Sequence, residues 1–281
     1  MSESFFIVDA FTQESFRGNP AAVVLLKDAA DDIDEWMQSV ATEFNLSETA
    51  FVYPQHDGHF RLRWFTPAFE VDLCGHATLA AASVLWQTKT VAANDPIHFK
   101  TRSGRLTAKT GFLPETDESG PLIELDFPVT PVHALEDAEV EAAVQACFSC
   151  VGEPLNWEFI GQSTFDVVLQ CSTDRQVREV QVDYRRLAEL DFRGAIVTAR
   201  TDKPTFDIVS RFFAPKAGID EDPVTGSAHC ALTDYWGRRL NRDELTAWQA
   251  SKRGGSVRMK RSGDRVTLGG YAVQFCAGQL E

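Results

Sequence analysis

The chain has 281 residues, a formal net charge of −14 at pH 7 and an isoelectric point near 4.9. At roughly 150 residues per domain, this length predicts about two domains, each large enough to bury its own core. The acidic balance argues against nucleic acid and anionic membrane surfaces as partners, and no apolar run reaches the ~18 residues that span a bilayer. The chain opens with neither a basic region nor a long apolar stretch, so we expect a cytoplasmic protein without a secretory signal.

Strands dominate the prediction for the first half of the chain. Strands are expected at 5–11, 21–26, 46–53 and 60–66, and a helix is expected at 31–44. Asn19 falls in the turn before the second strand, where its amide can donate and accept hydrogen bonds at once. The alternative for Asn19 is a plain turn residue before a proline.

Glu48 stands at the start of the strand at 46–53, among apolar neighbours. Such a setting disfavours the charged form of a carboxylate, which is the tuning that a general acid/base needs. A glutamate on an exposed strand edge is the alternative interpretation.

The segment from His76 to Trp86 is apolar or small at nearly every position, which predicts a helix buried on all sides. Gly75 and His76 occupy its first turn, where unpaired backbone N–H groups and the helix dipole favour an anion. A histidine that only caps or packs at the helix start is the alternative. Strands are expected next at 97–109 and 122–127, with a polar turn at 114–121 between them.

A helix is then predicted at 136–150, where Cys147 and Cys150 form a CxxC pair. Without a second pair or a nearby histidine, two partly buried helix cysteines are a better interpretation than a zinc site. The six cysteines are sparse and irregularly spaced, which is typical of reduced thiols in a cytoplasmic enzyme.

The second half repeats this plan. Strands are expected at 165–170, 195–199 and 206–213, a short helix at 183–190, and a second mostly apolar helix at 227–236. A glycine turn at 249–257 enters another strand, and strands at 265–268 and 271–275 are predicted to form a closing hairpin. Asp222 lies in the loop before the apolar helix, either as a site residue or as a loop acid that closes an Asx-turn.

The segments 63–86 and 211–236 resemble each other. The two arginines and the prolines four residues after them align, and with three extra residues allowed in the second copy Cys74-Gly75-His76-Ala77 falls on Thr225-Gly226-Ser227-Ala228. We therefore expect a duplicated domain with halves at 1–130 and 131–281, an active-site cleft between them, and the chain end packed into the first half. A strand layer curled around its own apolar helix, an α+β fold, would satisfy each half.

Five motifs follow one another along the chain: GNPAAVVL, SETAFV, RWFTPAFEVDLCGHATLAAA, GIDEDPVTGSAHCAL and QASKRGG. Together they resemble the PhzF-like phenazine-biosynthesis family, which is related to diaminopimelate epimerase and proline racemase. The resemblance covers essentially the whole chain. It implies a diaminopimelate epimerase-like fold of two β-barrel-like halves around central helices, commonly a homodimer. It also implies an isomerase that needs no metal, flavin or pyridoxal phosphate.

Carried over residue by residue, the resemblance implies four catalytic residues: Glu48, His76, Asp222 and Ser227. A small carboxylate substrate would lie over two helix starts, with binding residues Asn19, Cys74, Gly75, Ala77, Gly226 and Ala228. The mechanism that such a site suggests is shuttling by one base. Glu48 would take a proton from one carbon and return it to another on the same face of the substrate.

Three other functions remain open at this point. Epimerisation with two bases would use Cys74, but the matching position holds Thr225, whose hydroxyl is far too weak an acid. A hydrolase would use Ser227, which lacks the GxSxG elbow. A non-catalytic small-acid binding protein would keep the helix-end site alone. No metal site is expected because the six histidines are scattered, and the identity of the substrate, phenazine synthesis included, is left undecided.

Overall fold

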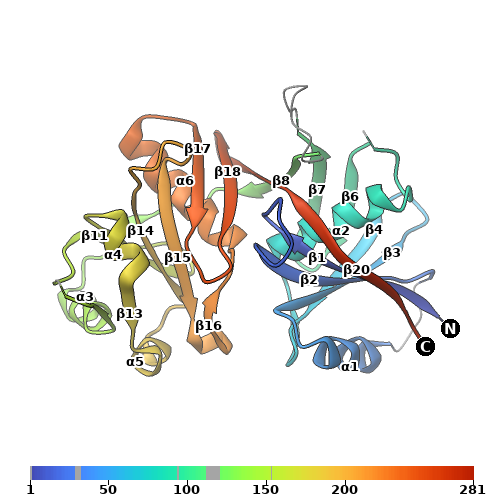
Figure 1. The fold of residues 1–281 in the computed structure, drawn as a ribbon, viewed down its shortest axis with the longest axis horizontal. Helices are drawn as coiled ribbons and strands as arrows, with labels where there is room; N and C mark the ends of the chain where they lie inside the picture. The colour runs from blue at the N-terminus through green and yellow to red at the C-terminus, as the bar shows by residue number, and fades with distance from the viewer. Residues whose placement is uncertain (1, 29–32, 94, 112–120, 153) are drawn as a thin grey trace. The chain divides into compact units, whose positions relative to one another are not determined.

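The structure is a computed structural model that describes residues 2–28, 33–93, 95–111, 121–152 and 154–281. The chain divides into two compact units, which we call unit 1 (Met1–Phe127 with Thr267–Glu281) and unit 2 (Pro128–Val266). Figure 1 shows the elements of each. Positions 31–32 of the predicted first helix and 114–120 of the predicted polar turn lie outside the described residues.

Unit 1 is a sheet in which chain neighbours pair with one another. Its elements are β1 (Glu3–Ala10), β2 (Asn19–Leu25), α1 (Asp34–Phe44), β3 (Glu48–Pro54), β4 (Phe60–Phe65), β5 (Glu70–Val71), α2 (Gly75–Gln87), β6 (Ile97–Thr101), β7 (Gly104–Thr110) and β8 (Ile123–Pro128). β1 pairs antiparallel with β2, β2 runs parallel to β3, and β3 pairs antiparallel with β4. β4 runs parallel to β6, which pairs antiparallel with β7.

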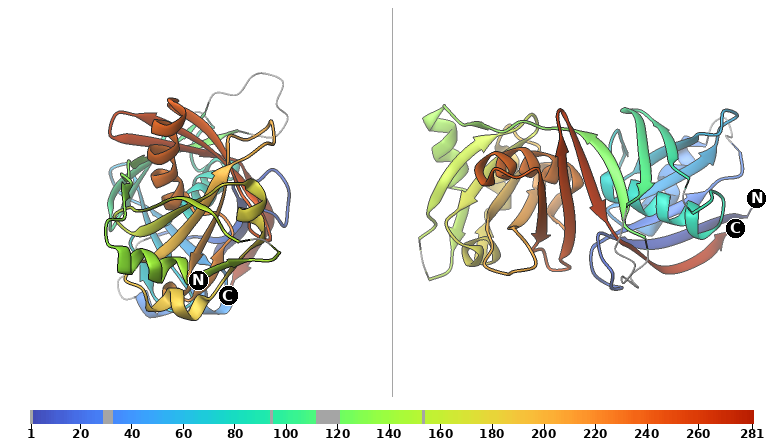
Figure 2. Two further views of the ribbon diagram at one scale, coloured as in Figure 1. Left: turned by 90° about the vertical axis from the view of Figure 1, so that its left-hand side faces the viewer. Right: turned by 90° about the horizontal axis from the view of Figure 1, so that it is seen from above.

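The core of unit 1 is built around α2. Every residue from His76 to Trp86 is buried, and the helix packs against β1, β2, β3, β7 and β20 (Ala272–Leu280). Figure 2 shows the sheet curving about this helix. A helix without a polar face has to be enclosed by other elements, so the predicted buried helix is confirmed.

Unit 2 repeats the same order of pairing. Its elements are β9 (His133–Ala134), α3 (Ala138–Gln145), β10 (Phe148–Cys150), β11 (Trp157–Gln162), β12 (Asp166–Cys171), α4 (Asp174–Glu179), β13 (Val180–Val182), α5 (Tyr184–Glu189), β14 (Gly194–Arg200), β15 (Ile208–Ala214), η1 (Pro215–Ala217), β16 (Ile219–Asp222), α6 (Gly226–Leu240), β17 (Glu244–Gln249) and β18 (Gly255–Ser262). β11 and β12 are antiparallel, β12 and β14 parallel, β14 and β15 antiparallel, β15 and β17 parallel, and β17 and β18 antiparallel. This is the sequence of pairings found in unit 1.

The duplication extends to individual ion pairs. The guanidinium of Arg63 on β4 donates to both oxygens of Glu70 on β5, at 2.8 and 2.7 Å. Arg211 on β15 donates in the same way to Glu221 on β16, at 2.7 and 2.9 Å. Each guanidinium also lies over the phenylalanine two residues further along its strand, 5.1 and 4.8 Å from the ring centroid. These bidentate pairs hold the strand turns that lead into α2 and α6.

Two predicted elements are wrong in their extent. The helix expected at 136–150 ends at Gln145, and Phe148–Cys150 forms β10, which pairs with β13. Cys147 and Cys150 are therefore not helix cysteines, because a distant strand partner decided their conformation. The strand expected at 97–109 is the hairpin of β6 and β7, which turns at Gly104 with a φ of 109°. Glycine adopts such a positive φ without a steric penalty.

The chain end also differs from the prediction. The expected closing hairpin is wrong: β20 pairs antiparallel with β1 over its whole length, from Glu3 opposite Leu280 to Ala10 opposite Ala272. β17 was not expected at all, and it lies between β15 and β18. Among the residues that the structure describes, no helix combines the length and apolar character needed to cross a membrane.

Candidate active site

Four of the predicted site residues converge at one end of α2. Asn19 begins β2, Glu48 begins β3, and Cys74 directly precedes α2, whose first turn carries His76. β2 and β3 run parallel with Ala21 opposite Glu48, so both strands start at the same edge of the sheet. Local sequence places each residue at an element start, and strand pairing brings those starts together.

His76 is the centre of this cluster. Its Nε2 lies 3.2 Å from Glu48 Oε2, and its Nδ1 lies 3.2 Å from Asn19 Nδ2 and 3.5 Å from Cys74 Sγ. The histidine side chain is 6% exposed and the glutamate side chain 14% exposed. Glu48 is thus neither fully buried nor on an exposed strand edge, and its carboxylate faces a ring nitrogen.

Charge and burial act on this cluster in opposite directions. Burial alone lowers the pKa of His76, but the Cys74 sulfur and the Glu48 carboxylate outweigh it and raise that pKa well above the ordinary value. Burial, followed by the Glu48 charge, raises the pKa of Cys74 to about 11. At neutral pH the Cys74 thiol is therefore protonated.

The same three side chains form a set of candidate metal ligands. One donor atom each from Glu48, Cys74 and His76 lie within 4.8 Å of one another. Metals bind thiolate and neutral imidazole. A metal bound here would have to displace the proton of the Cys74 thiol, whose pKa burial raises to about 11.

The start of α6 in unit 2 corresponds to the start of α2, but it carries different side chains. Asp222 ends β16 and is 8% exposed, and Thr225 precedes the first turn of α6. The Thr225 hydroxyl donates to Asp222 Oδ2. Ser227 is half-buried in that first turn, between the buried residues Gly226 and Ala228.

Both central helices begin without a side-chain cap. Cys74 before α2 and Thr225 before α6 make no capping hydrogen bond, although threonine is a good capping residue. Thr225 is diverted to Asp222 instead. Neither helix has an acidic residue in its first turn. Backbone N–H groups at the start of a helix without an acidic side chain favour a ligand with negative charge.

Sequence reasoning missed Gln249, the last residue of β17. Its side chain is fully buried. Its Nε2 donates to the Asp222 carbonyl at 2.7 Å, and its Oε1 accepts from the Thr225 N–H at 2.9 Å. One amide therefore clamps both ends of the loop that carries Asp222. The residue stood within the motif QASKRGG, but the segment was interpreted only as a glycine turn.

His229 was also missed. It is completely buried in α6, with Nδ1 2.7 Å from the Thr225 carbonyl and Nε2 3.5 Å from Ser210 Oγ. Burial lowers its pKa to about 4, so the ring is neutral at pH 7. The corresponding residue of α2 is Thr78, whose hydroxyl donates to the Cys74 carbonyl at 2.6 Å. In each central helix, a side chain of the first turns therefore hydrogen-bonds the carbonyl of the residue that precedes the helix.

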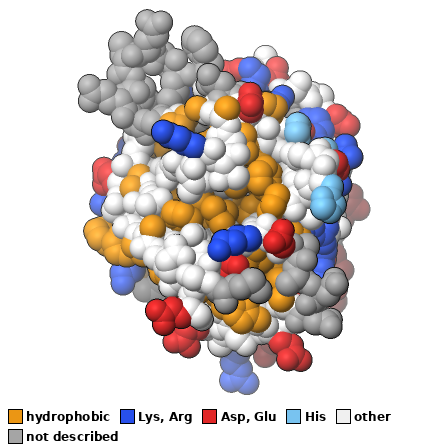
Figure 3. Space-filling view, turned by 90° about the vertical axis from the view of Figure 1, so that its right-hand side faces the viewer, with side chains coloured by type: hydrophobic (Ala, Val, Ile, Leu, Met, Phe, Trp, Pro, Cys, Tyr) orange, Lys and Arg blue, Asp and Glu red, His pale blue; other side chains and the backbone are white. Residues whose placement is uncertain are grey.

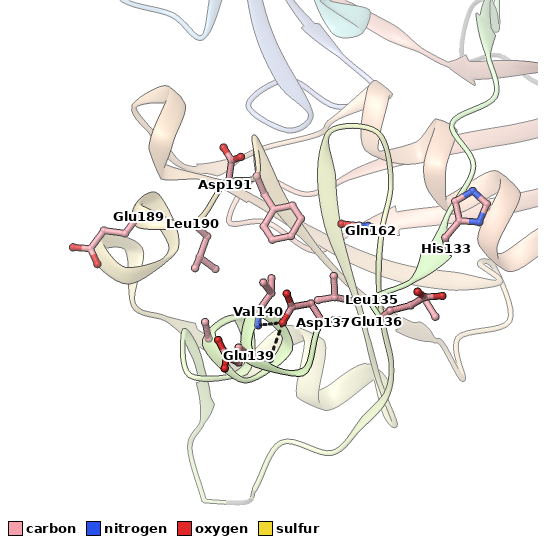
Figure 4. Close-up of a pocket in the computed structure, with 13 residues that line it drawn as sticks. His133, Leu135, Glu136, Asp137, Glu139, Val140, Gln162, Glu189, Leu190 and Asp191 are labelled. Carbon is pink, nitrogen blue, oxygen red and sulfur yellow. Dashed lines mark hydrogen bonds between the residues drawn. The ribbon is translucent and has the colours of Figure 1, made fainter.

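A separate hollow of about 970 Å³ opens elsewhere in unit 2 (Figure 4). It lies over Leu135, Val140 and Phe192, and Asp137 on its rim accepts hydrogen bonds from two backbone N–H groups at the start of α3. None of the predicted site residues lines this hollow.

Comparisons with known proteins bear on family and fold. Residues 8–278 match the model of the PhzC-PhzF family, described as phenazine biosynthesis-like protein. The chain is 44% identical over 281 residues to an uncharacterized isomerase of Halalkalibacterium halodurans, covering 100% of this chain and 99% of that protein. A crystal structure of a PhzF-family phenazine biosynthesis protein from Enterococcus faecalis covers 100% of both chains with 38% identity and a TM-score of 0.86.

A more distant likeness concerns the fold alone. A hydroxyproline epimerase from Agrobacterium vitis is 8% identical with a TM-score of 0.62, over 99% of this chain and 92% of that one. The predicted epimerase-like α+β fold is thereby confirmed. The family match over nearly the whole chain also confirms the resemblance seen in the five motifs. The chain belongs to the PhzC-PhzF family of phenazine biosynthesis-like proteins.

Proposed function

We propose that the protein is a cofactor-independent isomerase that moves a proton between carbons of a small carboxylate substrate, with Glu48 as general acid/base. The observation that carries this proposal is the Glu48 carboxylate, 14% exposed and 3.2 Å from the imidazole of His76. A relative named as an isomerase, 44% identical over the whole chain, supports the reaction class.

Each group of unit 1 has a distinct role in this proposal. Glu48 accepts a proton from one substrate carbon and returns it to another carbon on the same face. His76 donates from Nε2 to the carboxylate or to a substrate heteroatom. Asn19, 3.2 Å from Nδ1, keeps the ring oriented. A general base of this kind contributes roughly two to four orders of magnitude in rate.

The substrate carboxylate is proposed to bind at the uncapped helix starts, over the N–H groups of Gly75 to Ala77 and of Gly226 to Ala228. Asp222 would hydrogen-bond a substrate heteroatom, and Ser227 would orient the anion. That these groups of unit 2 act on the same substrate as Glu48 is part of the proposal. The matching pattern of uncapped helix starts in both units supports it.

The experiment is proton exchange in D₂O. Candidate small carboxylates are incubated with the parent protein, Glu48→Gln and the matched control Glu43→Gln, whose side chain is exposed on α1. We expect deuterium to enter a C–H position with the parent and the control, and roughly 100- to 10,000-fold more slowly with Glu48→Gln. Exchange or isomerisation by Glu48→Gln within tenfold of the parent would remove Glu48 from the role of base, and binding with neither exchange nor isomerisation would favour a receptor.

A two-base epimerase remains the second candidate because Cys74 lies 3.5 Å from His76. Its thiol has a pKa of about 11, however, and the Thr225 hydroxyl at the matching position donates to Asp222. We therefore expect Cys74→Ala to keep most of the exchange activity.

We also propose that the protein is a cytoplasmic homodimer. Light scattering checks the mass in solution, and unchanged activity after dialysis against EDTA checks independence from metals.

A further inference from the structure

A small pocket of about 250 Å³ opens in unit 1 between β1, β2, β3 and the end of α2. Its apolar lining includes Leu25, Leu26, Val52, Phe60 and Leu85. At ~30 Å³ per water molecule, this volume corresponds to roughly eight waters, which is room for a small organic molecule. Figure 3 shows the side of unit 1 near the chain termini, where apolar side chains gather in the middle with charged groups beside them.

The pocket contains a buried carboxylate. Glu3 lines it and is only 8% exposed, and its Oε2 accepts no hydrogen bond from any residue that the structure describes. The register of β1 opposite β20, with Glu3 facing Leu280, places the residue there. A carboxylate enclosed by apolar side chains is unfavourable unless a donor or a cation reaches it. A ligand that enters the pocket can supply the hydrogen-bond donor or the cation that Glu3 Oε2 lacks among the described residues.

The surroundings favour a positive charge. Leu85 lies in the last turn of α2, a turn without a basic residue, and the partial negative charge of a helix C-terminus attracts cations. Lys27 also lines the pocket, but it is exposed and does not donate to Glu3 Oε2. Leu85 follows His76 by nine positions along the helix, roughly 14 Å, so the pocket is separate from the Glu48 cluster.

We propose that this pocket binds a small organic ammonium ion. The ammonium group donates to Glu3, and the apolar body of the ligand packs against Leu25, Val52 and Leu85. The mostly apolar lining favours an organic cation over a bare metal ion, because Glu3 is the one carboxylate among the described residues that line the pocket.

The test uses the full-length protein with methyl-labelled leucine and valine, followed by NMR. Benzylammonium is titrated in parallel with benzyl alcohol, which has nearly the same shape but no charge. We expect benzylammonium to shift the methyl signals of Leu25, Val52 and Leu85, and to bind roughly ten- to a hundredfold more tightly than the alcohol. Glu3→Gln should abolish that preference, and Glu43→Gln should keep it.

A second variant protects the test against a folding defect in Glu3→Gln. Thr90 lines the pocket and is exposed, so Thr90→Trp should narrow the mouth without disturbing the core, and benzylammonium should bind at least tenfold more weakly. The proposal is overturned if the three methyl signals do not move, if the alcohol binds as tightly as the amine, or if both variants bind like the parent. None of these readouts depends on isomerase activity.

Discussion

At the scale of single residues, the proposed chemistry rests on the pair of Glu48 and His76. The two side chains lie 3.2 Å apart in a mostly buried setting, where a charge interacts more strongly than it does in water. The His76 ring faces the carboxylate on one side, and the Asn19 amide and the Cys74 thiol lie on the other. In the proposed reaction, this carboxylate is the group that exchanges a proton with a substrate carbon.

The raised pKa of His76 gives a prediction at this scale. Burial alone lowers that pKa, and Cys74 and Glu48 raise it, so removing the glutamate charge should lower it. We expect the ring of the parent to stay protonated above pH 6.5, and the His76 titration in Glu48→Gln to move to lower pH. NMR of the histidine Cε1–H signals checks this, with Glu43→Gln as control. An unchanged midpoint would show that the carboxylate does not hold the proton on the ring.

At the scale of elements, the loop between β16 and α6 is held from three sides. Gln249 bonds both ends of it, the Ser251 hydroxyl donates to the Pro223 carbonyl at 2.8 Å, and His229 bonds the Thr225 carbonyl. The end of β17 therefore orients the carboxylate that precedes α6. A parallel partner of β15 was needed to bring this clamp into place.

Gln249→Met tests the clamp, because it keeps the side-chain length but removes both hydrogen bonds. We expect amide hydrogen exchange over residues 222–228 to rise at least tenfold, and activity on a carboxylate substrate to fall by roughly tenfold or more. Ser251→Ala, which removes only the bond to Pro223, is the matched control and should change activity less. Equal effects of both variants would mean that loop stability alone matters.

His229 gives a prediction about pH. Its folded pKa of about 4 lies below the ordinary value near 6.5, so the unfolded chain binds the extra proton first. The stability from this group is fully present above pH 6.5 and is lost as the pH falls towards 4, in total about 3 kcal/mol.

His229→Thr copies the residue that α2 uses at this position, Thr78, and removes the titrating ring. Urea unfolding of both proteins between pH 4 and 7 should show a weaker pH dependence in the variant. Parallel curves would show that the buried ring does not account for the acid sensitivity.

At the scale of the whole molecule, the last strand completes the first unit. β20 pairs with β1 along its length, although some 260 residues separate them in the chain. Its side chains are mostly exposed or half-buried, so it contributes mainly main-chain hydrogen bonds to the β1 edge.

Truncation after Tyr271 tests this dependence. We expect hydrogen exchange to rise strongly in β1 and β2 of unit 1, while β14 and β15 of unit 2 stay protected, because unit 2 has its own core. Removing only Glu281, which lies beyond β20, is the control and should change neither unit. Equal loss of protection in both units would show that they unfold together.

Much of the fold could be read from local pattern. The buried helix at His76 to Trp86, the second one from Gly226, and the repeat that relates them follow from apolar periodicity and turn residues, which act over a few positions. The strand bounds, the early end of α3 and the partner of β20 could not be read in this way. They depend on which segment, far away in the chain, supplies the hydrogen-bond partners of each strand. A single sequence does not reveal that pairing.

For the candidate site as well, the residue types could be predicted from the sequence, and their contacts could not. Motif and residue type alone indicated Glu48, His76, Asp222 and the two glycine turns, because proton transfer and anion binding restrict which side chains are suitable. Only the folded chain places the carboxylate of Glu48 against the ring of His76, turns Thr225 away from capping, and brings Gln249 to the loop. These relations join residues from 3 to 28 positions apart, and strand register, which is decided by packing, sets their distances.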